Sequence, residues 1–121
     1  MSARGTHEAA ARINAVLAQR HDRAGSQERP WVPTFLFYAG VQLVECALAD
    51  QGEHPSQHGD REALVALQWR SGSASYRQLK QLSEYWRYRG RQPSDTELRN
   101  AWAWAQELAA AVREPWPEQN P

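Results

Sequence analysis

The stretch TFLFYAGVQLVECALADQGEHPSQHGDR, residues 34–61, decides how the rest of this chain folds. Residues 34–50 are nearly all apolar, and on a helix their aliphatic and aromatic side chains cover most of the circumference. A helix that is apolar on almost every side belongs in the middle of a domain. The sequence therefore predicts a central buried helix over residues 34–50 that Gly52 brings to an end.

The few polar side chains of this helix fall on one narrow stripe. Tyr38, Gln42, Glu45 and Ala49 recur at helical spacing, which places them on one line along the helix. A carboxylate on an otherwise buried helix needs a cationic partner, because an unpaired buried charge is strongly destabilising. Arg87 is the natural partner for Glu45, and this pairing would withdraw Arg87 from ligand binding. In the alternative, Arg87 remains available to a ligand.

Composition points to one water-soluble domain. The chain has 121 residues with six Trp, four Tyr and two Phe, enough for one sizeable core, and its basic and acidic residues cancel at fourteen each. Cys46 is the only cysteine, which rules out an intrachain disulfide and fits a reducing cytoplasm. The apolar run over residues 35–49 is shorter than the roughly 20 residues of a membrane span. We expect a cytoplasmic protein without a membrane partner.

Helical periodicity recurs outside the central stretch. Residues 6–21 predict a first amphipathic helix, and residues 25–33 predict a connection whose last residue, Pro33, suits a first helical turn. The apolar side of the first helix is expected to be formed by four residues. These are Ala9, Ile13, Val16 and Leu17.

The second half of the chain carries three more helix signals. Ser56 or Asp60 can cap a short third helix, and residues 70–75 are expected to form a flexible linker. Two capping boxes open the last two helices, Ser75 with Gln78 and Ser94 with Glu97. The prediction is an all-α, up-and-down bundle of four long helices plus one short helix. It is a single domain over residues 1–121, with its core at about 6–114 and a tail over 115–121.

Arginines interleave with aromatic residues towards the end of the fourth predicted helix. Arg87, Arg89 and Arg91 alternate with Tyr85, Trp86 and Tyr88. A run of charges can be no more than a solvated helix face. The sharper interpretation is an anion site, because guanidinium and aromatic groups together bind phosphates and bases.

The histidines give weaker signals. His54 and His58 are four residues apart, but Pro55 and Gly59 interrupt a regular helix and neither a third histidine nor an HExxH glutamate lies close by, so we expect no metal and no cofactor. A turn that caps the third helix is the simpler interpretation. An anion held at that helix N-terminus near His58 and Arg61 is a further option. An acid–base pair of Gln42 and Glu45 is a thinly supported alternative, since an amide does not transfer protons usefully and Glu45 alone makes no mechanism.

Two separated motifs resemble those of small bacterial HEPN-type helical domains. The first joins an aromatic-Tyr-Ala run to a later Glu and a Gly-x-His-Pro-x-x-His turn, and the second reads Tyr-x-x-Leu…Ser…Arg-Tyr. The resemblance spans about residues 31–112. The matching residues are Tyr38, Ala39, Glu45, Gly52, His54, Pro55, His58, Tyr76, Leu79, Ser83, Arg87 and Tyr88.

The resemblance implies a bundle of four or five helices, commonly a homodimer, in families tied to RNA cleavage, toxin–antitoxin systems, phage defence and nucleotide binding. The chain departs from the pattern of the active ribonucleases, which carry an Arg followed by His on a late helix. No histidine follows His58, and Gln42 stands where similar sequences favour histidine. The family's catalytic roles are therefore not carried over to this chain.

Three functions follow as hypotheses. The leading one is a HEPN-like module that binds RNA, a nucleotide or a cognate protein without catalysis, in a toxin–antitoxin or defence setting. The rivals are a divergent ribonuclease that uses His54, His58 and Arg87, and a purely structural dimeric partner of a neighbouring enzyme. The expected binding residues are Gln42, Glu45, His58, Arg61, Arg87, Tyr88, Arg89 and Arg91.

Overall fold

The computed structural model describes residues 3–54, 58–88 and 91–117, and for residues 58 and 59 it describes the backbone only. This part of the chain is helical and contains no strand, which confirms the predicted all-α bundle. Five α-helices and a 3-10 turn follow one another along the chain. They are α1 (Ala3–His21), η1 (Arg29–Trp31), α2 (Val32–Asp50), α3 (His58–Gln68), α4 (Arg70–Arg87) and α5 (Asp95–Ala111).

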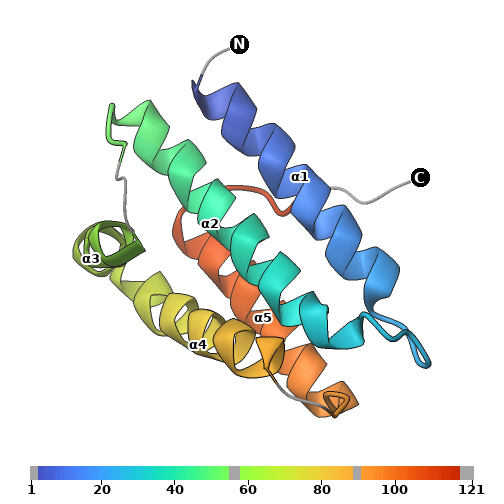
Figure 1. The fold of residues 1–121 in the computed structure, drawn as a ribbon. Coiled ribbons are helices and arrows are strands. Elements are labelled where there is room, and N and C mark those ends of the chain that lie inside the picture. Colours follow the sequence, from blue (N-terminus) through green and yellow to red (C-terminus); the bar gives the residue numbers. More distant parts are fainter. Residues whose placement is uncertain (1–2, 55–57, 89–90, 118–121) are drawn as a thin grey trace.

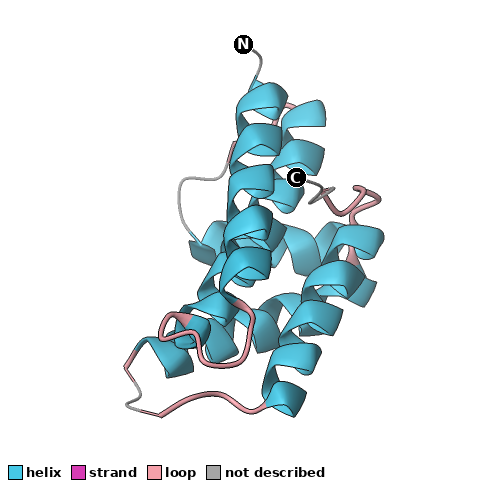
Figure 2. Ribbon diagram, turned by 90° about the vertical axis from the view of Figure 1, so that its right-hand side faces the viewer, coloured by secondary structure: helices cyan, strands magenta, loops and turns pink. Residues whose placement is uncertain are grey.

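The four long helices run alternately up and down, and the short α3 crosses them (Figure 1). α2 contacts α1 on one side and α4 and α5 on the others, while α3 packs against α4. The view turned by 90° shows that loops join the helices at the ends of the bundle (Figure 2). α2 is thus the central helix, as its composition predicts.

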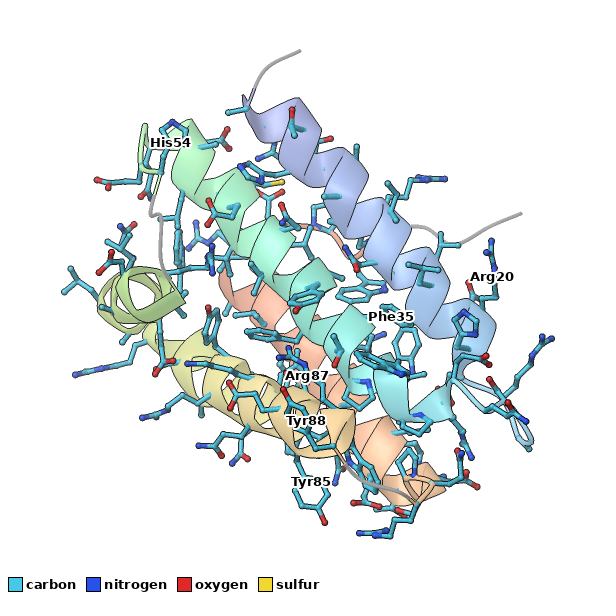
Figure 3. The ribbon with its side chains drawn as sticks, viewed as in Figure 1. Arg20, Phe35, His54, Tyr85, Arg87 and Tyr88 are labelled. Carbon is cyan, nitrogen blue, oxygen red and sulfur yellow. The ribbon has the colours of Figure 1, made fainter. Side chains whose placement is uncertain are left out.

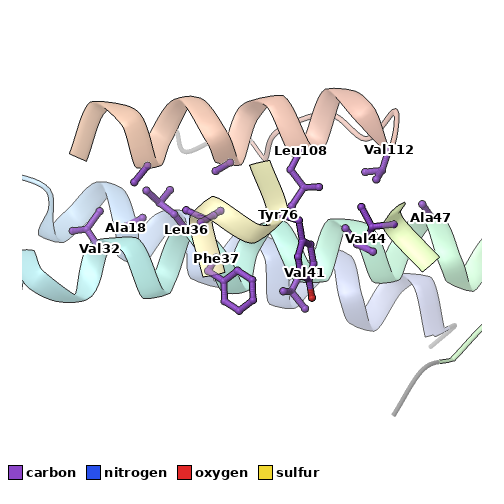
Figure 4. Close-up of a cluster of buried hydrophobic side chains, with 14 of the residues drawn as sticks. Ala18, Val32, Leu36, Phe37, Val41, Val44, Ala47, Tyr76, Leu108 and Val112 are labelled. Carbon is purple, nitrogen blue, oxygen red and sulfur yellow. The ribbon is translucent and has the colours of Figure 1, made fainter. Parts of the chain in front are cut away.

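The core lies along α2. Leu36, Val44 and Leu48 have no exposed surface, and they pack with side chains from α4 and α5 such as Tyr76 and Leu108 (Figure 4). In the described residues, Arg29–Asp50 is the one helical span long and apolar enough to cross a membrane, and 78% of its most apolar window is buried inside the protein. The bundle's own core therefore accounts for this apolar composition.

The ends of α2 follow the sequence signals. Pro33 lies in the first turn, where a missing N–H costs no hydrogen bond. At the other end Gly52 adopts φ 75°, and the Glu53 N–H donates to the Leu48 carbonyl at 2.9 Å. This left-handed turn satisfies a carbonyl of the last helical turn, as Gly does at many helix ends.

The expected inner face of α1 is wrong. Ile13 is 60% exposed and Ala9 is exposed, whereas the buried residues are Ala11, Ala15 and Ala18. Both sets have helical spacing, so periodicity alone does not separate them. Three small side chains on one line let the backbones of α1 and α2 approach closely, and packing therefore selects the alanine stripe.

The expected linker over residues 70–75 is also wrong, because these residues form the first turns of α4. Gly72 lies so close to α5 that an added Cβ would be 2.8 Å from the Ala111 Cβ. Ser75 donates to Glu107 Oε2 at 2.8 Å and is no helix cap, so the capping box predicted for Ser75 and Gln78 is absent. The small residues that suggest a linker in the sequence instead allow α4 and α5 to pack closely.

The final helix begins as predicted, but the chain beyond it is not a free tail. Ser94 and Glu97 form the capping box that opens α5. After α5, Arg113 adopts φ 61° and turns the chain back, so that Glu114 Oε1 accepts a bond from Arg4 Nη2 at 2.6 Å. Trp116 then packs on the core beside Trp102. We call residues 112–117 the C-terminal strap.

Candidate nucleic-acid interface

Arg87 occupies the last turn of α4 and faces α2. Its Nε lies 3.5 Å from Thr34 Oγ1, and its Nη2 lies 3.3 Å from the Tyr38 hydroxyl. The guanidinium carbon is 5.7 Å from the centre of the Tyr38 ring. Among the described residues no carboxylate contacts Arg87. Its charge is held in place by hydroxyl groups and an aromatic ring without being neutralised.

Arg91 follows α4 and faces α5. Its guanidinium lies over the Trp86 ring at 4.8 Å from the centre, and its Nη2 is 3.4 Å from the Tyr85 hydroxyl. Its one close carboxylate in the described part of the chain is Glu97, at 3.9 Å, and the Arg91 side chain is 62% exposed. Such an exposed, long ion pair holds a guanidinium only weakly.

These arginines and their rings lie around the end of α4, Arg87 on its α2 side and Arg91 on its α5 side. Tyr88 is 86% exposed, and Figure 3 shows Arg87, Tyr88 and Tyr85 near the end of α4, with Arg87 directed toward α2 and Tyr85 directed away from it. Arg89, which was expected to belong to the same site, lies outside the described residues. We call this group of residues the arginine–aromatic cluster. Its members are Tyr38, Tyr85, Arg87, Tyr88 and Arg91.

Glu45 is buried as predicted, but its expected partner is wrong. Arg61 of α3, not Arg87, donates from Nε to Glu45 Oε1 at 2.6 Å, and the two side chains are 12% and 6% exposed. Arg87 meets α2 at Tyr38, seven residues before Glu45, which is about 10 Å along a helix axis. Arg61 meets α2 at the level of Glu45 and pairs with its carboxylate, whereas Arg87 meets α2 too far along the helix to do so. Arg87 therefore has no carboxylate partner among the described residues.

The ion pair lies in a set of polar side chains from four helices, which we call the buried polar cluster: His7, Gln42, Glu45, Arg61 and Tyr76. Burial lowers the pKa of Arg61, but hydrogen bonding to Glu45 and Tyr76, together with the charge interactions with these two groups, outweighs it, so the pKa stands above its ordinary value. Burial also raises the pKa of Tyr76, against the opposing effect of the neighbouring Arg61. Arg61 is thus a largely buried cation that is paired with Glu45 inside the protein.

His7 is a member of this cluster that sequence reasoning missed. Its Nδ1 lies 2.6 Å from Gln42 Oε1, and its Nε2 lies 3.9 Å from Glu45 Oε2. A signal existed, because the buried stripe Ala18, Ala15, Ala11 reaches His7 when it is extended by four residues. The Gln42 side chain is therefore hydrogen-bonded to His7 within the protein.

Of the rival ribonuclease set, the two members whose side chains are described, His54 and Arg87, are not brought together. His54 is exposed beyond the C-terminal end of α2, and Figure 3 places it far from Arg87. Tyr38, which Arg87 contacts, and Asp50 at the helix end are separated by about 18 Å of helix. The His58 side chain lies outside the described part of the structure. Neither Arg87 nor Arg91 contacts a histidine among the described residues.

Neither metal-binding nor thiol chemistry stands out in the described residues. They contain no group of three or more His, Cys, Asp and Glu side chains that could hold a metal ion. Cys46 is buried within α2, and burial raises the pKa of its thiol to about 11. A buried thiol of this kind is a packing residue and a poor nucleophile.

The chain matches no family model, and comparisons with curated proteins and with solved structures also give no match.

Proposed function

We propose that this protein is a HEPN-like domain that binds single-stranded RNA or nucleotides at the arginine–aromatic cluster and does not cleave them. The observation that supports it best is the state of Arg87. Its expected partner Glu45 pairs with Arg61 instead, so the Arg87 guanidinium is ordered by Thr34 and Tyr38 and keeps its charge for a ligand.

The chemistry of the cluster suits a nucleotide strand. A guanidinium binds phosphate through two parallel N–H···O bonds, and the exposed ring of Tyr88 offers a face on which a base can stack. Arg91 already lies over Trp86, so its side chain is partly ordered before a ligand arrives. Groups held in their binding geometry lose less conformational entropy on binding.

Binding without cleavage is proposed because no member of the cluster is a histidine or a carboxylate that could act as the base. Metal-independent RNA cleavage needs a group that removes the 2′-hydroxyl proton and a cation near the developing phosphate charge. The cluster supplies cations, but its other members are the tyrosines Tyr38, Tyr85 and Tyr88, and neither a histidine nor a carboxylate is among its five residues. The resemblance to HEPN domains extends the proposal to a toxin–antitoxin or defence setting in the cytoplasm, with a cognate protein partner.

The binding test uses a fluorescently labelled single-stranded RNA and a salt titration. Replacing Arg87 and Arg91 together by Gln removes two charges, and it should reduce the slope of log affinity against log salt by about 1.4. The double change to Glu should abolish binding. Arg70→Glu is the matched control, because Arg70 is exposed at the opposite end of α4, about 25 Å away. This variant should bind the RNA as the wild type does. Equal binding by the wild type and the double variant would reject the proposal.

A second assay addresses cleavage. Labelled RNA incubated with the wild type should remain intact, as it should with a His54→Ala, His58→Ala double variant. Cleavage by the wild type that disappears in this variant would instead support the divergent ribonuclease.

A further inference from the structure

A groove beside the arginine–aromatic cluster suggests which part of a bound RNA strand the protein recognises. It lies between α4 and α5 and has a volume of about 300 Å³. Tyr85 belongs to both features, since it lines the groove and its hydroxyl is 3.4 Å from Arg91 Nη2. The lining residues are Gln78, Gln81, Leu82, Tyr85, Glu97 and Trp104.

The lining divides into apolar walls and hydrogen-bonding groups. Leu82, Tyr85 and Trp104 offer apolar and aromatic surface, while Gln78 and Gln81 carry amides that both donate and accept. A nucleobase has the complementary form, with an apolar flat face and an edge of donors and acceptors. The volume is at the small end of ligand pockets and is suited to one base.

Glu97 adds a preference among bases. Its Oε1 accepts the Ser94 N–H at 2.9 Å in the capping box of α5, which fixes the side chain. Among the described residues Oε2 accepts no hydrogen bond. A carboxylate oxygen held in this way favours a base with an exocyclic amino group, and uracil has none. Gln is the side chain that pairs with the amino and ring nitrogens of adenine.

The two helices that form the groove are held in fixed register. Gly72 lies against Ala111, and Ser75 donates to Glu107 at 2.8 Å, so α4 and α5 are joined directly next to the groove, the Ser75–Glu107 bond being about one helical turn from Gln78 and Trp104. Trp104 also packs partly on the core. The groove is therefore formed before a ligand binds.

We infer that this groove receives an adenine base of the strand whose phosphates Arg87 and Arg91 bind. The inference rests on the proposed function, because the base is delivered by a strand held at the arginine–aromatic cluster. It goes further in assigning Trp104, Gln78, Gln81 and Glu97, none of which belongs to that cluster, to base recognition.

Three fluorescent probes of equal length separate the base from the backbone: oligoadenosine, oligouridine and an abasic phosphodiester strand. The wild type should bind oligoadenosine about tenfold more tightly than the abasic strand, the size expected of one stacked base, and oligouridine should be weaker than oligoadenosine. Trp104→Leu and Gln81→Ala should each reduce the affinity for oligoadenosine and leave that for the abasic strand unchanged. Gln19→Ala, an exposed change on α1, is the matched control.

A second measurement uses the wild type alone, so it does not depend on whether a variant folds. Adding adenosine monophosphate to the ¹⁵N-labelled wild type should shift the indole N–H resonance of Trp104 and the side-chain amides of Gln78 and Gln81. Unshifted signals at a concentration that occupies the protein would overturn the inference.

The two proposals fail in different ways. If no strand binds with salt-sensitive affinity, the proposed function fails and takes the base site with it. If all three probes bind equally, or if the preference for oligoadenosine survives both groove variants, the base site is wrong while RNA binding by the cluster stands.

Discussion

The Glu45–Arg61 ion pair allows the sharpest test of the fold. Replacing Glu45 by Ala leaves a guanidinium buried without its carboxylate, and removing one partner of a buried pair costs about 3–5 kcal/mol. The Arg61 side chain is 12% exposed, so water still reaches it and the lower end applies, about 3 kcal/mol. Arg61→Met leaves Glu45 buried without its cation. Because the Glu45 side chain is only 6% exposed, this variant should lose more free energy of unfolding than Glu45→Ala does.

Two controls identify the interaction. Replacing both residues, Glu45 by Leu and Arg61 by Met, removes both charges, so the double variant should be within about 1 kcal/mol of the parent. Arg87→Met should also cost less than about 1 kcal/mol, because its bonds are long and lead to hydroxyl groups.

Urea unfolding followed by circular dichroism at 222 nm measures these differences. A loss of about 3 kcal/mol also lowers the melting temperature by roughly 10 °C in a domain of this size. The reasoning fails if Glu45→Ala unfolds like the parent, or if Arg87→Met costs as much as Arg61→Met.

Four shorter predictions follow from other parts of the fold. Cys46 should not react with Ellman's reagent at pH 8 until urea is added, since a pKa of about 11 leaves about one thiol in a thousand ionised; rapid reaction of the folded protein would contradict its burial. Gly72→Ala should destabilise the protein by about 1–3 kcal/mol in urea despite the better helix propensity of Ala, because the new Cβ meets Ala111 at 2.8 Å; a stabilised variant would show that α4 and α5 can separate. Ser94→Ala should cost about 1 kcal/mol in the same assay through loss of the capping box, whereas unchanged stability would mean that water replaces the cap. Light scattering at tens of micromolar, an order-of-magnitude choice for a weak dimer, should give twice the 13.8 kDa chain mass for the expected two-fold homodimer, and a monomer mass would exclude it.

The fold was predictable wherever one physical effect dominates. The central helix follows from apolar residues on every side, its end from Gly52, and the start of α5 from Ser94 and Glu97. The errors share a cause. The inner face of α1 and the start of α4 depend on small residues, whose value lies in how closely a second helix can approach. Sequence periodicity carries no information about that distance.

The candidate site was predictable in kind but not in arrangement. The need of Glu45 for a cation followed from its place on an apolar helix, and so did the stripe that it shares with Gln42 and Tyr38. Which arginine serves Glu45 depends on where α3 and α4 cross α2, and a helical wheel does not give the crossing. The groove between α4 and α5 combines residues from both helices, so it appears only when their register is known.

The contacts of Arg4 bear on how the protein opens. This side chain lies 2.8 Å from Asp50 at the end of α2 and 2.6 Å from Glu114 in the C-terminal strap, so one guanidinium joins both ends of the chain to the end of the central helix. Fraying of the first turn of α1 therefore removes the Arg4 contact that helps to hold the strap, which Trp116 also anchors on the core, and release of the strap exposes the first turn. Amide hydrogens in these two segments, about 110 residues apart, should exchange at one common rate and not as two independent ends. The two termini then form a single cooperative unit, and a tag fused at either end reports on the other.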